Sequence, residues 1–370
     1  CGKWRECKPM VYHIWLSQAA GLNCDKACRL ICEFGSAEGV YKASEHSLRN
    51  KPYLKNSDID ALLDKDLQKA REIIDNCRKK SIDIITFSDK RYPDRLREIH
   101  LPPVVLYVRG KLPPIDDLPV FGIVGSRKPT LDSAAFALRT AKELTQAGML
   151  IVSGLAQGVD AKAAEGALEA GSTVAVLGTA IDYPYPKQNT GLYREICRKG
   201  AVISEYPPGE RTFPTSFIER NRIISGLSIG LLVVQAGKKS GSLKTARFAE
   251  DFGRYVFVSP GLPTSDEWEG SNELLRSGAF YTACARDILS QFDTCYEFNS
   301  ITDNEQPSVC VPDGLSPDEQ KVYLALNKPM RADDIAAACD MPSGEVAGIL
   351  TVMELMGHVE QTDTQIFRRK

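Results

Sequence analysis

The sequence GIVGSRKPT at residues 122–130 places an arginine at the tip of a glycine-containing turn. An apolar run, Val120–Val124, stops at Gly125-Ser126-Arg127, and a helical pattern begins shortly afterwards. Such strand–glycine–helix turns often bind phosphate, because backbone N–H groups can approach the anion and the helix adds its positive end. A guanidinium adds paired donors that match phosphate oxygens. Arg127 is therefore predicted to contact a phosphate group.

Glycine and serine also follow the other predicted strands, at 153–160, 178–180, 204–207 and 235–242. The carboxyl ends of parallel strands meet at one edge of a sheet, and ligands bind there. These turns are thus expected to form one groove for a long anionic ligand. Three basic residues lie in segments near the same edge: Lys187, Arg222 and Lys244.

Familiar nucleotide-binding and catalytic patterns are missing from this region. GKKSGSLKT resembles a P-loop, but Leu243 stands where that motif needs glycine. The first strand is not followed by GxGxxG, and no histidine falls between His100 and His358 to act as a base. We therefore predict no catalytic residue, metal or cofactor. The remaining acids are expected to cap helices and orient arginines: Asp160, Asp182 and Glu205.

The composition indicates a globular protein of two or three domains. The 370 residues are 43% hydrophobic and 25% charged, with a net charge of -2, so any nucleic-acid surface must be a local patch. Eleven cysteines without a CxxC pair favour free thiols in a reducing cytoplasm. Cys24, Cys28 and Cys32 recur every fourth residue and are interpreted as a packed helix face rather than a metal site. Neither a membrane span nor an apolar signal core is evident, so we expect a cytoplasmic protein.

Four segments follow from the periodicity. Residues 1–81 are helical and suggest a SAM or helix-hairpin-helix-like domain. Residues 82–298 begin with strands near 82–87 and 101–108 and then alternate strand and helix. This order predicts an α/β, doubly wound, Rossmann-like parallel sheet. A polar linker at 299–312 precedes 313–370, whose helices and final hairpin predict a winged-helix-like domain, with a Ser316 cap and Glu319 opening its first helix.

Residues 82–290 resemble the DprA/Smf family, the DNA-processing proteins of bacterial natural transformation. The resemblance is carried by IVGSR, SGLAQGVDAKAAEGALEAGSTVAVLGTAIDYPYPKQN, GAVISEYPPG, FIERNRIISGLSIGLLVVQA, SGSLKTARFAEDFGRYVFVSPG and EGSNELLRSGA. It implies a non-enzymatic recombination mediator that binds single-stranded DNA, forms a homodimer and loads the RecA recombinase on incoming DNA. We expect the dimer interface in the apolar region near Phe248, Phe252, Tyr255 and Leu262.

The resemblance also assigns roles. It implies phosphate contact by Ser126 and Arg127, a DNA-binding role for Lys187 and base stacking on Phe217. The predicted DNA-binding set is Gly125, Ser126, Arg127, Gly154, Lys187, Asn189, Phe217, Asn221, Arg222, Ser240, Gly241 and Lys244. Three positions depart from the family pattern, which has histidine, proline and glutamate there: Ala164, Ile218 and Gln235.

Two other functions remain open. The glycine-rich fold is also similar to phosphoribohydrolases, which would make the chain a nucleotide-processing or nucleotide-sensing enzyme. Their PGGxGTxxE run supplies a catalytic glutamate, whereas here SGSLKTARFAE lacks the double glycine and places Glu250 later. A transcription regulator that uses the C-terminal domain is the third hypothesis, and it requires sequence-specific duplex binding.

Overall fold

A computed structural model gives the structure of the chain, which forms two compact units, Cys1–Ile301 and Thr302–Lys370. The residues described are 8–19, 22–211, 213–299, 312, 315–326, 329–363 and 366–369.

A nine-stranded sheet, in the order β1-β2-β6-β5-β4-β3-β7-β8-β9, forms the centre of the first unit. Strand β2 runs antiparallel to both of its neighbours, β1 and β6. The strands that follow β2 in this sheet order, β6, β5, β4, β3, β7, β8 and β9, are parallel to one another. The predicted parallel α/β core is therefore confirmed, while β9 was not predicted. The strands are β1 (Asp83–Thr86), β2 (Val105–Gly110), β3 (Val120–Gly125), β4 (Leu150–Ser153), β5 (Thr173–Leu177), β6 (Ala201–Ser204), β7 (Gly230–Val234), β8 (Tyr255–Val258) and β9 (Phe280–Tyr281).

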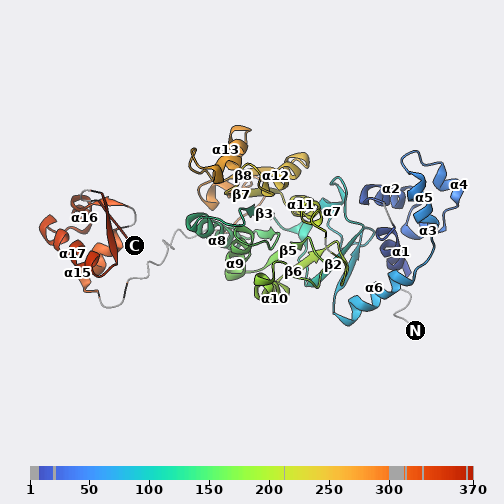
Figure 1. The fold of residues 1–370 in the computed structure, drawn as a ribbon, viewed down its shortest axis with the longest axis horizontal. Helices are drawn as coiled ribbons and strands as arrows, with labels where there is room; N and C mark the ends of the chain where they lie inside the picture. Colours follow the sequence, from blue (N-terminus) through green and yellow to red (C-terminus); the bar gives the residue numbers. More distant parts are fainter. Residues whose placement is uncertain are drawn as a thin grey trace. The chain divides into compact units, whose positions relative to one another are not determined.

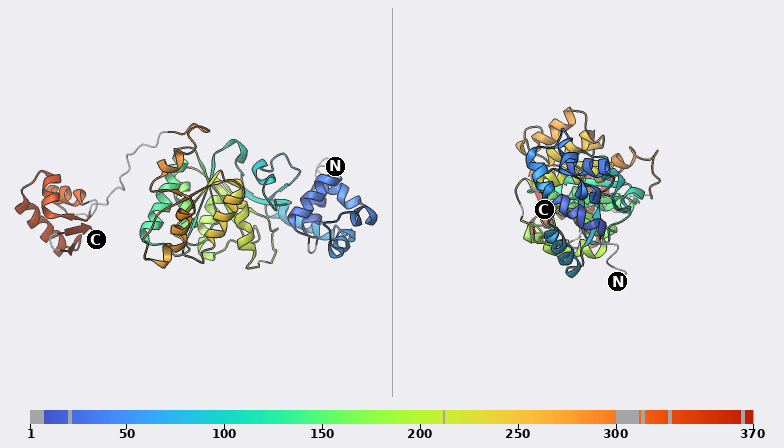
Figure 2. Two further views of the ribbon diagram at one scale, coloured as in Figure 1. Left: turned by 90° about the horizontal axis from the view of Figure 1, so that it is seen from above. Right: turned by 90° about the vertical axis from the view of Figure 1, so that its right-hand side faces the viewer.

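Helices cover both faces of this sheet (Figures 1 and 2). Helices α8 (Leu131–Gln146), α9 (Val159–Ala170) and α10 (Thr190–Lys199) pack on one face. Helices α11 (Ser216–Leu227) and α12 (Ser242–Asp251) pack on the other. Because β3 leads to α8 and β7 leads to α12, the connections from these adjacent strands diverge to opposite faces. Such a switch point opens a crevice at the carboxyl ends of the strands. Shorter helices of the same region include η2 (Ile115–Asp117), η3 (Lys187–Asn189), η4 (Asp266–Trp268), α13 (Glu269–Arg276) and α14 (Ala285–Leu289).

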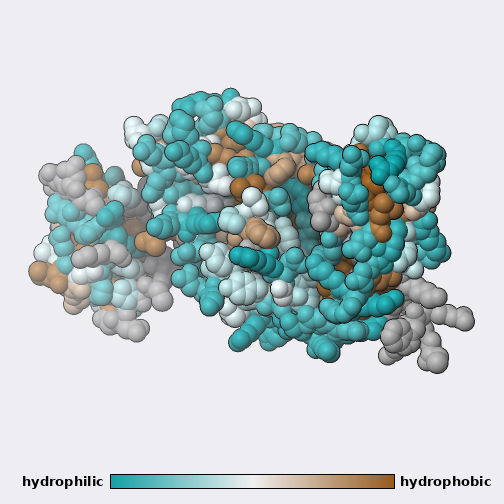
Figure 3. Space-filling view, turned by 45° about the vertical axis from the view of Figure 1, so that its right-hand side comes forward, coloured by the Kyte–Doolittle hydropathy of each residue, from teal (hydrophilic) through white to brown (hydrophobic). Residues whose placement is uncertain are grey.

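The N-terminal helices share a hydrophobic core with the sheet, in which residues such as Leu30 and Tyr107 are fully buried. Asn23 caps the second helix, which ends at Gly35 in the left-handed conformation. Within it Cys28 is buried, whereas Cys32 is exposed. On the face drawn in Figure 3, hydrophobic side chains form separate patches among hydrophilic ones. The helices are α1 (Lys8–Ser17), α2 (Cys24–Phe34), α3 (Ala37–Lys42), α4 (Glu45–Arg49), α5 (Asn56–Leu63) and α6 (Gln68–Lys79).

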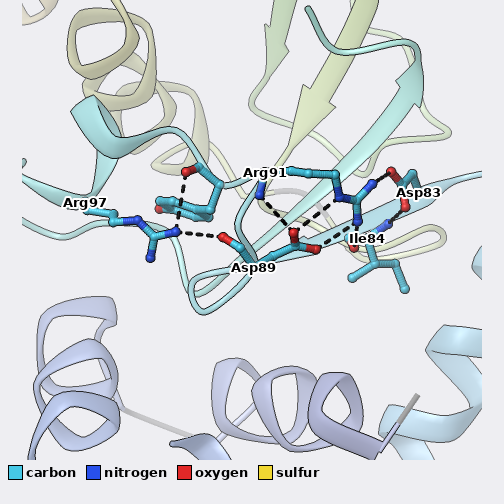
Figure 4. Close-up of polar contacts among 6 residues, drawn as sticks. Asp83, Ile84, Asp89, Arg91 and Arg97 are labelled. Atoms are coloured by element: carbon cyan, nitrogen blue, oxygen red, sulfur yellow. Dashed lines mark hydrogen bonds and ion pairs between the residues drawn. The ribbon is translucent and has the colours of Figure 1, made fainter. Parts of the chain in front are cut away.

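A polar network orders the segment between β1 and the short helix α7 (Asp94–Arg97) (Figure 4). Arg91 forms salt bridges with Asp83 and Asp89, and Arg97 donates to the carbonyl of Asp89 at 2.7 Å. Helix α7 packs against α11 at Gly226, where a Cβ atom would lie 2.9 Å from the side chain of Leu96. The network therefore holds α7 in place, and α7 in turn packs against α11.

The described residues of the second unit form three helices and a three-stranded antiparallel sheet of order β10-β12-β11. Ser316 and Glu319 form the predicted capping box at the start of its first helix. In the described residues no single helix is long and apolar enough to cross a membrane, and α16 with α17 passes that test only as a pair bent by 112°. The elements are α15 (Pro317–Ala325), β10 (Met330–Arg331), α16 (Ala332–Cys339), α17 (Ser343–Leu355), β11 (Val359–Asp363) and β12 (Ile366–Arg369).

Candidate nucleic-acid interface

A cleft of about 1010 Å³ lies at the carboxyl ends of β3 and β7, where the chain switches faces. One wall is the turn after β3, a second is the turn after β7, and α11 forms a third. This is the edge at which the sequence predicted a groove. Its shape follows from the opposite courses of the chain after β3 and β7.

The turn after β3 is held tightly against its neighbours. The backbone N–H of Ser126 donates to the carbonyl of Val234 at 3.2 Å, and Ser126 accepts from the N–H of Val159 at 3.1 Å. A Cβ atom on Gly125 would lie 1.9 Å from the Val234 oxygen, so this approach requires glycine. Arg127 is exposed at the tip and lines the cleft. The turn thus presents a guanidinium from a fixed backbone.

The floor of the cleft is a buried pair of opposite charges. Arg220 is 6% exposed, and its guanidinium donates to the carbonyl of Gly154 at 2.7 Å and to that of Val176. The Asp160 carboxylate accepts from the N–H of Gly154 at 3.0 Å. Burial raises the pKa of Asp160 against the opposing effect of Arg220, and burial lowers the pKa of Arg220 to about 10. The charges of the floor therefore oppose one another within the protein, whereas Arg127 at the edge of the cleft is exposed.

Aromatic rings form the wall contributed by α11, the loop before it and the loop after β5. Phe217 is half-buried, and its ring centroid lies 5.3 Å from that of Tyr185. A Cβ atom on Gly178 would lie 2.9 Å from the Cα of Phe217, so this glycine lets the helix approach the end of β5. Tyr183 and Phe213 also line the cleft and are exposed. The cleft therefore places flat apolar faces near a guanidinium.

The turn between β7 and α12 lines another side of the cleft. The hydroxyls of Ser240 and Ser242 are 2.6 Å apart, and Lys239 is exposed beside them. Gln235, one of the departures from the family pattern, is buried and accepts from the N–H of Thr130 at 2.8 Å. Its amide nitrogen donates to Glu267 at 3.0 Å, a contact that a glutamate at this position would lose when ionised. Gln235 therefore ties the turns after β3 and β7 together.

Most of the predicted DNA-binding residues meet at this cleft. Its lining includes Gly125, Ser126, Arg127, Phe217, Asn221, Ser240 and Gly241, and a small adjoining cavity of about 80 Å³ includes Gly154. Lys187 and Lys244 are exposed but lie outside the lining. Asn189 donates to the carbonyls of Leu155 and Ala156, at 3.0 and 3.2 Å, and so holds the loop after β4.

The structure contradicts the expectation that Arg222 contacts DNA. Arg222 is 4% exposed, and its guanidinium lies 2.6 Å from Glu205 and donates to the carbonyl of Leu101 at 2.8 Å. Although burial lowers the pKa of Arg222, Glu205 and Cys24 outweigh that effect and raise it. Glu205 therefore orients an arginine, as predicted. Arg222 links α11 to the end of β6, through Glu205, and to the segment before β2, through Leu101.

The sequence interpretation missed Arg220 and the rim aromatics. In a helix, positions three and four after Phe217 share its face, whereas a position five after it points away. This spacing places Arg220 and Asn221 toward the cleft and Arg222 away from it, and it could have been read from FIERNR. Tyr183, Tyr185 and Phe213 carried no comparable signal, because they lie in loops.

The other departures differ in position. Ala164 is a buried residue of α9, and Ile218 lines the cleft at 37% exposure. In the described part of the chain, no group of three or more His, Cys, Asp or Glu side chains could hold a metal ion.

Comparison with known proteins assigns this architecture to a family. The sequence pattern of the DNA recombination-mediator protein A family matches residues 83–293, and that of the DprA winged helix domain matches 306–363. The chain belongs to the DprA/Smf family. Protein Smf of Synechocystis is 31% identical over 390 residues, which cover 96% of this chain and 98% of that protein. DprA of Streptococcus pneumoniae is 37% identical over 63% of this chain and 78% of its own length.

Two solved structures of the DprA/Smf family share the fold. The X-ray structure of Streptococcus pneumoniae DprA superposes with a TM-score of 0.68 at 29% identity, covering 78% of this chain and 98% of that one. Helicobacter pylori DprA, whose structure was described for its single-stranded DNA binding mode, gives 0.52 at 32% identity over 58% of this chain and 97% of that one.

Proposed function

We propose that this chain binds single-stranded DNA in the cleft at the carboxyl edge of its sheet and acts as a non-enzymatic recombination mediator. The observation that supports it most is that Arg127, exposed on a fixed turn, lines the same cleft as the packed rings of Phe217 and Tyr185. A guanidinium suits phosphate, and aromatic faces suit unpaired bases of any sequence. The described binding mode of the Helicobacter pylori relative supports the same ligand.

Two features of the structure favour this function over the alternatives. Glu250, the acid that a phosphoribohydrolase-like mechanism would need, is exposed on α12 and is not part of the cleft lining. Helix α17, the recognition helix that a duplex-reading regulator would use, carries Glu345 and Glu354 and no lysine or arginine. An acidic helix is a poor match to DNA phosphates.

The mediator role extends the proposal beyond DNA binding. A cleft that holds the strand by its backbone and by stacking needs no turnover chemistry. From the match to the DNA recombination-mediator protein A family, we infer that the chain delivers the strand to RecA during natural transformation. A homodimer would lengthen the DNA track and raise avidity. Its proposed interface includes Tyr255 and Leu262, which are 46% and 68% exposed, and the stacked rings of Phe248 and Phe252.

A binding titration tests the ligand. Oligo-dT, a matched duplex and free mononucleotides are titrated at two salt concentrations and followed by fluorescence anisotropy or calorimetry. We expect tightest binding to oligo-dT, with an affinity that falls as salt rises because phosphate contacts release counterions. Equal affinity for duplex and single strand, or preferred binding of a mononucleotide with release of its base, would contradict the proposed function.

A further inference from the structure

Two aromatic side chains on the rim of the cleft have faces that the protein itself leaves uncovered. Tyr183 and Phe213 are 48% and 54% exposed, and both line the cleft. Tyr185, at 47% exposure, is already packed against Phe217. Within the described part of the chain, Tyr183 and Phe213 have no such ring partner. Apolar surface exposed beside a binding cleft is typical of an interaction site.

Tyr183 stands on a held backbone. Its N–H donates to the carbonyl of Ala180 at 2.9 Å, and its own carbonyl accepts from the hydroxyl of Thr179 at 2.6 Å. The preceding residue, Asp182, forms a salt bridge at 2.5 Å with Lys80, the residue that follows α6. The ring is therefore presented from a segment anchored on both sides, which lowers the ordering cost of binding.

Phe213 lies on a second loop that is anchored to the first. The N–H of Gly209 donates to the carboxylate of Asp182 at 2.9 Å, so one acid joins both loops. The carbonyl of Phe213 accepts from the N–H of Ser216, the first residue of α11, at 3.1 Å. Through these contacts the loops that carry the two rings and the helix that carries Phe217 form one wall of the cleft.

The chemistry of this wall fits unpaired bases. Aromatic side chains stack on any base, so they give affinity without base preference. Within a duplex both faces of each interior base are covered by its neighbours. Arg127 lines the same cleft, and Lys187, outside the lining, is exposed four residues after Tyr183. Positive charge for the backbone of the same strand is therefore available beside this wall.

We propose that Tyr183 and Phe213 form a second stacking position for an unpaired base, separate from that at Tyr185 and Phe217. The inference rests on the proposed function and specifies its ligand further. The strand must have at least two unpaired bases in the cleft at once, so single-strand selectivity comes from this wall as much as from the phosphate contacts.

The test compares Tyr183→Ala, Phe213→Ala and the double variant with Leu324→Ala, which truncates a side chain of 49% exposure in the second unit. Binding of an oligo-dT of about 12 nucleotides, within the range that single-strand-binding folds cover, is measured at several salt concentrations. We expect the Kd of the double variant to rise about 5- to 100-fold with an unchanged salt slope, because stacking rather than a phosphate contact is lost. Leu324→Ala should bind as the wild type does.

Abasic sites in the DNA give an independent readout. A single abasic site is moved along the oligonucleotide, and the Kd is measured for each position. The Kd of the wild type should rise at more positions than that of the double variant. The inference is overturned if the double variant retains the wild-type Kd and abasic profile while Arg127→Ala binds weakly, an outcome that leaves the proposed function standing. If the wild type itself does not prefer oligo-dT, both the inference and the proposed function fail. Unchanged melting temperatures establish that the variants are folded.

Discussion

Replacing Arg127 with alanine removes the exposed guanidinium at the tip of the turn after β3. The turn itself is held by backbone contacts of Ser126 with Val234 and Val159, at 3.2 and 3.1 Å, which the substitution leaves intact. The adjacent Lys128 is also exposed but does not line the cleft. Lys128→Ala is thus a matched control, since it removes the same charge from the same turn.

The magnitude follows from the contact that is lost. A hydrogen bond to a charged group contributes about 1.5–3 kcal/mol, which corresponds to a rise in Kd of roughly 10- to 150-fold. Each phosphate contact on a single strand contributes about 0.7 to the slope of log K against log salt, so the slope should fall by about that amount. Because Arg127 is exposed, the free energy of unfolding should change by less than about 0.5 kcal/mol.

The assay is a salt series of oligo-dT titrations on the wild type, Arg127→Ala and Lys128→Ala, together with thermal melts. We expect the slope and Kd to change for Arg127→Ala and to change little for Lys128→Ala. Equal effects of both substitutions would show that only the net charge of the turn matters. A large fall in melting temperature with DNA affinity retained would make Arg127 a structural residue, and either result would refute the reasoning.

Three further predictions concern other residues. Arg222→Met should lower the free energy of unfolding by about 3–5 kcal/mol in urea denaturation, since it leaves Glu205 without its cationic partner and with the thiol of Cys24 as a weak donor, and the folded variant should keep its DNA affinity. Arg127→Glu should abolish stimulation of RecA assembly on strands coated with single-strand-binding protein, and unchanged stimulation would count against the mediator role. Burial raises the pKa of Asp58, but Lys26 at 2.6 Å and a backbone N–H outweigh it and lower the pKa. The stability that Asp58→Asn loses should thus be present above about pH 3.9 and vanish as the pH falls further, which pH-dependent melts would check.

The sheet and the edge that carries the cleft were predictable because local signals agree there. Val120–Val124 and Leu231–Val234 are apolar runs, followed by glycine at Gly125 and at Gly237, and parallel strands buried on both faces have this pattern. The antiparallel placement of β2 and the pairing of β9 were less accessible. Both depend on contacts between segments distant in sequence, such as Tyr107 with Ser204.

The composition of the site was only partly predictable, because a residue's place in it depends on the direction of its side chain as well as on its type. Arg220 and Arg222 are two residues apart, yet one forms the floor of the cleft and the other pairs with Glu205 behind it. Helical spacing resolves that choice. The exposure of Phe213 and Tyr183 depends on loop anchors such as Asp182, and no periodicity reveals them.

The central claim is that a single strand occupies the cleft between the turn after β3 and helix α11. Photo-crosslinking of oligo-dT that carries 5-iodouracil, followed by peptide mapping, tests this most directly because the reaction requires contact between base and protein. The account predicts adducts on the rim aromatics Tyr183, Tyr185, Phe213 and Phe217, and loss of these adducts in Arg127→Glu. Adducts confined to α17 and the strands of the second unit, with none on the cleft, would contradict it.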